Sequence, residues 1–174
     1  LFLINYLNEI SNLANFLFFG ILTLIIFLKY NFPKAKVFLG DGGSYFLGAF
    51  IAISVVKTSI LNPSISPFYF CILLFYLFFE VFFSFFRKLI KEKKSPLLPD
   101  DKHLHMLLYK LLLKKNDDKL KSNYYVGIVI NIVYLILIIP GIIMMEDGQF
   151  CKYYSIIIFI AYIFSYKIIN AKIK

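Results

Sequence analysis

The sequence is 174 residues long, 60% hydrophobic and 20% aromatic, and only 17% of its residues are charged. Soluble domains have about 45–50% apolar and about 25% charged residues, so this composition excludes an ordinary soluble domain and indicates a membrane protein. The net charge is +9, but the basic loop at 87–123 has a single tyrosine among its lysines and is flanked by apolar segments, which argues against a nucleic acid partner.

Five apolar segments are each long enough to cross a bilayer, which takes about 20 helical residues. They predict an all-α integral membrane protein, a polytopic helix bundle built as one multispan domain over residues 1–174. Between the third and fourth segments, a basic cytoplasmic loop at 87–123 is predicted to carry an amphipathic helix at 103–115. The five predicted spans are residues 12–28, 42–61, 67–86, 124–145 and 153–170.

The lysines and arginines predict how these spans are oriented. Three lie between the first two spans, eleven between the third and fourth, and three in the last turn of the fifth or after it. Only Lys57 and Lys152 remain for the opposite side. Because cytoplasmic loops carry an excess of such residues, the start of the chain is expected outside and its C-terminus in the cytoplasm. A basic face of this kind also attracts anionic lipids.

The stretch "FLGDGGS" places Asp41 among glycines at the cytoplasmic start of the second predicted span. A carboxylate costs about 2.5–3.5 kcal/mol at the centre of a membrane helix, so a partner for Asp41 is expected. Glycines such as Gly43 let the backbone approach a phosphate, and Ser44 with the free amides of a helix start suits an anion. Asp41 itself suits a hard cation such as Mg²⁺. The alternative is an N-cap acid followed by small residues for close helix packing.

Glu80 lies inside the third predicted span, where a carboxylate marks a functional candidate. Ser84 follows one helical turn later and Arg87 three residues after that. The three residues are therefore predicted to form one polar stripe that points to the cytoplasmic entrance. The alternative for Glu80 is a buried, hydrogen-bonded acid that fixes helix packing.

The stretch "PDDKHLHMLL" contains both histidines of the chain, His103 and His105, beside Lys102. Two residues apart on a helix, the histidines would point in different directions, and no cysteine pair or third histidine supports zinc. Contact with a phosphate or diphosphate fits better. The alternative is a structural helix start, which Asp100 or Asp101 would cap.

Together these motifs resemble the polyprenyl-phosphate N-acetylhexosamine-1-phosphate transferases, which form glycosyltransferase family 4. The peptidoglycan phospho-N-acetylmuramoyl-pentapeptide transferase is a more distant relative. The first family block is matched in order by Asn31, Pro33, Ala35, Val37, Phe38, Leu39, Gly40, Asp41, Gly43, Ser44, Leu47 and Gly48. The second block is matched by Glu80, Ser84, Arg87, Ser95, Pro96, Asp100 or Asp101, His103 and His105.

The resemblance implies transfer of an N-acetylhexosamine-1-phosphate from a UDP-sugar to undecaprenyl phosphate, with release of UMP. Such a reaction initiates a lipid-linked glycan of the cell envelope, for example an O-antigen. The family implies Mg²⁺ or Mn²⁺ at Asp41, and catalytic roles for Asp41, His103 and His105. Glu80 is expected to have a supporting role. Substrate binding is expected of Asn31, Gly43, Ser44, Arg87 and Lys102.

The partners implied are undecaprenyl phosphate, a UDP-N-acetylhexosamine, the lipid bilayer and a second copy of the chain in a homodimer. The expected location is the bacterial inner membrane, with a multi-pass topology and the active site on the cytoplasmic face.

The sequence departs from the family pattern in two places. Met106 stands where many relatives have a further histidine, and the family's paired-aspartate block is missing before Asn31. The chain is therefore expected to be the C-terminal portion of such an enzyme and inactive alone. Two alternatives stay open: an inactive truncated remnant of the family, and a membrane transporter subunit that uses Asp41 and Glu80 as ion or proton sites. The sequence shows no repeat that would support a transporter.

Overall fold

The computed structural model describes residues 1–93, 95–96, 98, 100–115 and 117–173. Two lysines counted above among the cytoplasmic cations, Lys94 and Lys174, lie outside the described residues. The part of the chain so described is helical and contains no strand. Four helices are long and apolar enough to cross a membrane, or five if one bent pair counts as a span, which confirms the predicted all-α polytopic fold. The chain divides into two compact units, Leu1–Ile65 and Ser66–Lys174.

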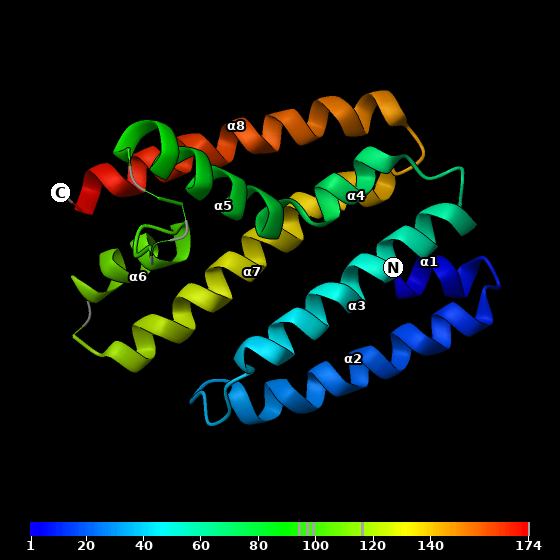
Figure 1. Cartoon of the computed structure of the whole chain (residues 1–174), viewed down its shortest axis with the longest axis horizontal. Helices are drawn as coiled ribbons and strands as arrows, with labels where there is room; N and C mark the ends of the chain where they lie inside the picture. The colour runs from blue at the N-terminus through cyan, green and yellow to red at the C-terminus, as the bar shows by residue number, and fades with distance from the viewer. Residues whose placement is uncertain (94, 97, 99, 116, 174) are drawn as a thin grey trace. The chain divides into compact units, whose positions relative to one another are not determined.

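The first unit consists of three helices, α1 (Phe2–Leu7), α2 (Ser11–Asn31) and α3 (Gly40–Leu61). Figure 1 shows α2 and α3 side by side, running in opposite directions. They correspond to the first two predicted spans. Gly20 of α2 leaves room for the Phe50 ring of α3, because a Cβ at position 20 would collide with that ring.

A buried polar network closes one end of the first unit. The Asn5 side chain donates a hydrogen bond to Thr58 Oγ1 (2.8 Å), and Asn62 donates to Asn5 Oδ1 (3.3 Å). Asn5 and Thr58 are fully buried. These bonds satisfy polar groups that would otherwise be costly away from water, and they hold α1 against the C-terminal end of α3. Asp41 lies at the other end of α3.

The second unit begins with a broken span. The structure divides the predicted 67–86 segment into α4 (Pro67–Leu73) and α5 (Phe75–Phe86), and the two parts are bent by 78°. The Tyr134 hydroxyl donates a hydrogen bond to the Leu73 carbonyl at this break. Backbone groups freed at a break in a membrane helix need such a partner.

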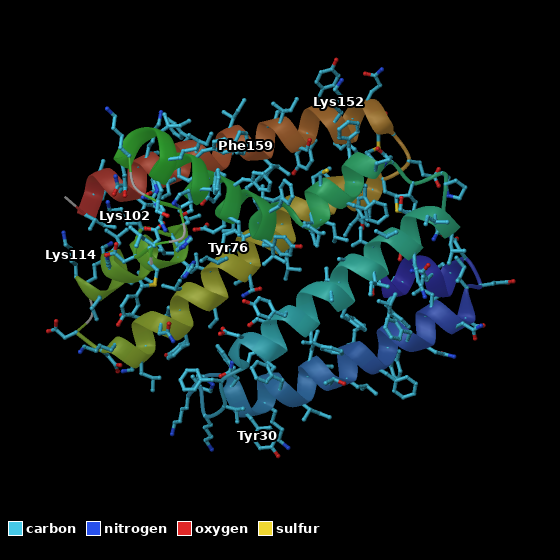
Figure 2. All side chains as sticks on the ribbon, viewed as in Figure 1. Tyr30, Tyr76, Lys102, Lys114, Lys152 and Phe159 are labelled. Atoms are coloured by element: carbon cyan, nitrogen blue, oxygen red, sulfur yellow. The ribbon has the colours of Figure 1, made fainter. Side chains whose placement is uncertain are left out.

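Beyond α5, the π-helical turn η1 (Arg87–Glu92) is followed by α6 (Leu104–Leu113), α7 (Lys119–Ile143) and α8 (Gly148–Ile173). α6 is the helix expected at 103–115, and it packs on α7 and α8 through an apolar face that includes the buried Leu107. Figure 2 labels Lys102 and Lys114 near the end of α8 and Lys152 near its start. Lys102 and Lys114 therefore lie at the end of this unit opposite to Lys152.

Candidate functional site

The predicted site residues fall into both units. Asn31, Asp41, Gly43 and Ser44 belong to the first unit, and the others belong to the second: Glu80, Arg87, Lys102, His103 and His105. Each group is described within its own unit.

Asp41 is exposed in the first turn of α3. The helix starts at Gly40, whose φ of +67° is unfavourable for residues with a Cβ, and Leu39 is the N-cap residue without a side-chain cap. The N-cap alternative for Asp41 is therefore wrong, because this residue lies inside the helix. A carboxylate in the first turn is favoured by the helix dipole, and the uncapped amides beside it suit an anion.

The glycines that follow Asp41 differ in how closely the described residues pack around them. A Cβ built on Gly42 or Gly48 would meet nothing within 4 Å. A Cβ on Gly43 would come within 2.8 Å of the Leu39 side chain. The Ser44 hydroxyl donates to the Gly40 carbonyl (2.8 Å), so its hydrogen is engaged within α3. Gly42 and Gly48 therefore have open space beside them among the described residues, and both the ligand and the packing alternatives stay predictions.

Asn31 ends α2, and its carbonyl accepts a hydrogen bond from the Ala35 amide (2.7 Å). The loop from 32 to 39 contains a cis peptide between Phe32 and Pro33 and returns the chain directly to α3. Asn31 and Asp41 consequently lie at the same end of the α2–α3 pair (Figure 1).

In the second unit, the Glu80 carboxylate lies at the junction of three helices. Its Oε1 atom accepts from the backbone amide of Leu104 (2.8 Å) and lies 2.9 Å from His103 Nδ1. Its Oε2 atom accepts from the Tyr162 hydroxyl (2.7 Å). Glu80 is only 8% exposed. This carboxylate joins α5 to the start of α6 and to α8.

Asp100 binds the two residues that follow Glu80 in the predicted polar stripe. Its Oδ2 atom accepts from Ser84 Oγ (2.5 Å) and from Arg87 Nη2. The structure therefore brings Glu80, Ser84 and Arg87 onto the face of α5 and η1 that meets the 100–104 segment. Asp101 does not take part, because its side chain is exposed and pairs with Lys110 Nζ (2.6 Å). Of the two aspartates that the sequence left open, Asp100 is the one in the cluster.

Neither aspartate caps α6, and that prediction is wrong. His103 is the N-cap residue, without a side-chain cap bond, and Glu80 accepts the Leu104 amide from another helix. The expectation that His103 and His105 point apart is also wrong. His103 has extended backbone angles (φ −65°, ψ 151°), which places its ring against the His105 ring at a centroid distance of 5.6 Å and an interplanar angle of 11°.

Lys102 stands at the rim of this cluster. Its Nζ atom lies 2.9 Å from Glu92 Oε1, and its amide donates to Asp100 Oδ1 (3.0 Å). Glu92 Oε1 also lies 2.5 Å from Arg87 Nη1. The buried Lys88 is held by the carbonyls of Pro96 and Leu98. The region thus concentrates cations, two of which are held in place by acidic partners.

The surroundings shift the pKa of three groups here. Burial lowers the pKa of His105, although the Glu80 charge opposes this. Burial tends to raise the pKa of Asp100, but hydrogen bonds from Ser84 and the Lys102 amide, with the Arg87 charge, hold it below its ordinary value. The hydrogen bond from Lys102 lowers the pKa of Glu92, against a smaller effect of burial.

The lowered pKa values predict an acid-sensitive second unit. Asp100 and Glu92 have lower pKa values folded than unfolded, so the stability they contribute is present above their unfolded pKa values of about 4 and is lost as pH falls further. We expect the thermal unfolding midpoint of the purified protein in micelles to fall steeply below about pH 4.5. An Asp100→Asn variant should show a shallower fall. Parallel curves for variant and parent would contradict this assignment.

Two contributors were missed by sequence reasoning. Tyr162 is one of 13 tyrosines in the chain and lies 82 positions from Glu80, so nothing in the pattern marks it. Glu92 could have been found, because it follows Arg87 by five residues and is the only acid in the basic run before Asp100.

The described residues contain no group of three or more histidine, cysteine, aspartate or glutamate side chains that could hold a metal ion. Mg²⁺, however, often binds through one or two carboxylates with the remaining ligands from water and substrate phosphates. The exposed Asp41 carboxylate fits that limited role. Arg87 pairs with Asp100 and Glu92, so those two acids are less suited to a cation.

The chain is similar to one protein family and to two characterised or probable sugar-phosphate transferases. Residues 1–59 match glycosyl transferase family 4. The undecaprenyl-phosphate alpha-N-acetylglucosaminyl 1-phosphate transferase of Thermotoga maritima is 41% identical over 83 residues, which cover 48% of this chain and 27% of that protein. The probable undecaprenyl-phosphate N-acetylglucosaminyl 1-phosphate transferase of Bacillus subtilis is 33% identical over 115 residues, 64% of this chain and 31% of that protein. The chain thus spans less than a third of the length of these relatives. No solved structure matches it significantly.

Proposed function

Because residues 1–59 of this chain match glycosyl transferase family 4, we propose that it is part of an enzyme that transfers a sugar-1-phosphate to undecaprenyl phosphate. The donor is a UDP-N-acetylhexosamine, and UMP is released. The names of two relatives support the lipid acceptor and the sugar-phosphate product. The observation that carries the proposal is the exposed Asp41 beside the uncapped start of α3, inside the matched residues.

The reaction exchanges one phosphoanhydride linkage for another. An oxygen of the lipid phosphate attacks the β-phosphorus of the UDP-sugar and forms a new P–O bond. The bond between that phosphorus and the bridging oxygen breaks, and its electron pair stays on the oxygen that leaves with UMP. Catalysis of such a transfer depends on positioning and on stabilisation of negative charge rather than on covalent chemistry by the protein.

Residues of both units fit these needs. A bound Mg²⁺ or Mn²⁺ would neutralise diphosphate charge, and Asp41 would supply one of its ligands. At the start of α3, the free backbone amides would donate to phosphate oxygens beside Gly43 and Ser44, and Asn31 lies at the same end. In the second unit, the stacked histidines and the half-exposed Lys102 would contact phosphates of the nucleotide sugar. Arg87 would act chiefly by holding Asp100 and the loop before α6.

The membrane location follows from the apolar helices and from the relatives. We further propose the bacterial inner membrane, with the Asp41 end and the His103 end on the cytoplasmic face, where UDP-sugars are made. The distribution of lysines supports this orientation. The proposed glycan is a lipid-linked polymer of the cell envelope.

The test is UMP release by the complete protein, encoded by the reading frame extended upstream of Leu1, in membranes supplied with undecaprenyl phosphate and UDP-N-acetylhexosamines. We expect UMP release that needs the lipid acceptor, stops with EDTA and returns with Mg²⁺ or Mn²⁺. The 174-residue chain alone should release none, because it spans less than a third of the length of the two relatives. Absence of UMP release from a folded complete protein with every UDP-N-acetylhexosamine would overturn the proposal.

A further inference from the structure

The hydrogen bonds around Glu80 determine which nitrogen of His103 carries a proton. An ionised carboxylate is an acceptor only. Oε1 receives the Leu104 amide, which can only donate, and the same oxygen lies 2.9 Å from His103 Nδ1. Oε2 receives the Tyr162 hydroxyl. Three donors therefore converge on two oxygens, and Nδ1 must contribute its N–H to this arrangement.

The opposite nitrogen of His103 is thereby left for another partner. Nε2 lies 3.9 Å from Asp100 Oδ2, beyond hydrogen-bond distance, and the side chain is 28% exposed. His105 stacks on the ring and limits its rotation. The imidazole is consequently held in one orientation, with Nδ1 on Glu80 Oε1 and Nε2 on the side of Asp100, while the His103 side chain stays partly exposed.

The environment of Tyr162 strengthens this arrangement. Tyr162 is buried and lines an apolar cavity of about 240 Å³ together with Leu104 and Tyr76. A hydrogen bond in such low-polarity surroundings is electrostatically stronger than one in water. Tyr76 lines the same cavity, but its hydroxyl is buried without a hydrogen-bond partner among the described residues. The two tyrosines thus differ in whether they touch the Glu80 carboxylate.

From these contacts we infer that Glu80 and Tyr162 are positioning residues for His103: they hold the Nδ1–H tautomer, so that the Nε2 lone pair can accept the proton of a P–OH group of a substrate phosphate. Glu80 acts directly on the ring, and Tyr162 acts by orienting the carboxylate. Partners that orient a functional histidine in this way typically change activity when they are mutated, although they touch no substrate. This role rests on the proposed function only as far as the identity of the phosphate is concerned.

The first experiment measures the tautomer without any assay of activity. The complete protein is labelled with ¹⁵N-histidine, purified in detergent micelles and studied by NMR, with a His103→Gln variant to assign the ring. We expect the neutral His103 ring to be protonated at Nδ1 in the parent protein. Glu80→Gln should keep this tautomer, because the Leu104 amide holds the amide oxygen in the place of Oε1. Glu80→Met should lose the preference for the Nδ1–H tautomer, because methionine offers no oxygen to accept from Nδ1.

The second experiment separates positioning from structure by kinetics. We expect Glu80→Met to lower kcat about 10–100-fold with a smaller change in KM for the UDP-sugar, and Glu80→Gln to stay within about tenfold of the parent. Tyr162→Phe should lower kcat about 3–10-fold. The matched control is Tyr76→Phe, which removes an unpartnered hydroxyl from the same cavity and should leave kcat unchanged.

The positioning of His103 and the proposed reaction can be contradicted independently of each other. An Nε2–H tautomer in the parent, or an unchanged tautomer in Glu80→Met, would overturn the positioning role even if UMP is released normally. Equal losses of kcat in Glu80→Gln and Glu80→Met, or in the two tyrosine variants, would do the same. If the parent shows the Nδ1–H tautomer but releases no UMP, the proposed reaction is wrong while the positioning of His103 stands.

Discussion

Asp41→Asn in the complete enzyme is expected to lower kcat at least about 100-fold, the size of effect seen when one group that stabilises transition-state charge is removed. The amide keeps the shape of the side chain but loses the charge that a divalent cation requires. Asp41 is exposed in the first turn of α3, so the substitution removes no buried contact and the protein should stay folded. The measurement is UMP release at saturating substrates over a range of Mg²⁺ concentrations.

Glu9→Gln is the matched control for this variant. Glu9 and Asp41 are the only acids in the first 65 residues, both are exposed, and Glu9 lies in the turn between α1 and α2. We expect Glu9→Gln to keep the turnover and metal dependence of the parent. A fully active Asp41→Asn enzyme with unaltered Mg²⁺ dependence would remove Asp41 from the metal site.

The sequence predicted the helices well because hydrophobic length alone determines which segments can cross a bilayer. It could not predict the break at Leu74, where neither proline nor glycine interrupts the apolar run. The break depends on a tertiary contact, because the Tyr134 hydroxyl of α7 donates a hydrogen bond to the Leu73 carbonyl. Local composition carries no trace of such a partner.

The candidate site likewise has residues that the sequence could predict and side-chain directions that it could not. Asp41 and Glu80 were identified because a carboxylate is conspicuous in an apolar sequence. The choice between Asp100 and Asp101 was open, since adjacent residues of one type differ only in the direction their side chains take. His103 was misplaced onto a helix, although its extended backbone sets the ring against His105. The direction of a side chain in this loop depends on its partners in α5, and the spacing of residues in the sequence does not encode those partners.

The pair Asp100 and Asp101 offers the second large prediction, on stability. Both side chains of the Asp100–Arg87 ion pair are nearly buried, at 5% and 6% exposed. Asp100→Asn removes the negative charge and places an amide where Ser84 and Arg87 both donate. Breaking a buried pair strands the remaining charge and costs about 3–5 kcal/mol in general. Because Glu92 still pairs with Arg87, we expect a smaller loss of about 2–3 kcal/mol in the free energy of unfolding.

Asp101→Asn makes the same chemical change one residue away and should leave stability unchanged. The Asp101 side chain is 68% exposed and its partner Lys110 is 37% exposed, so solvent screens the pair and can replace it. The measurement is denaturant unfolding of the complete protein in mixed micelles at pH 7 for both variants. The gap between the two variants should narrow as pH falls through the lowered pKa of Asp100, where its carboxylate becomes protonated. Equal losses in the two variants would mean that the ion pair around Arg87 does not hold the loop before α6, and the positioning of His103 would then need another cause.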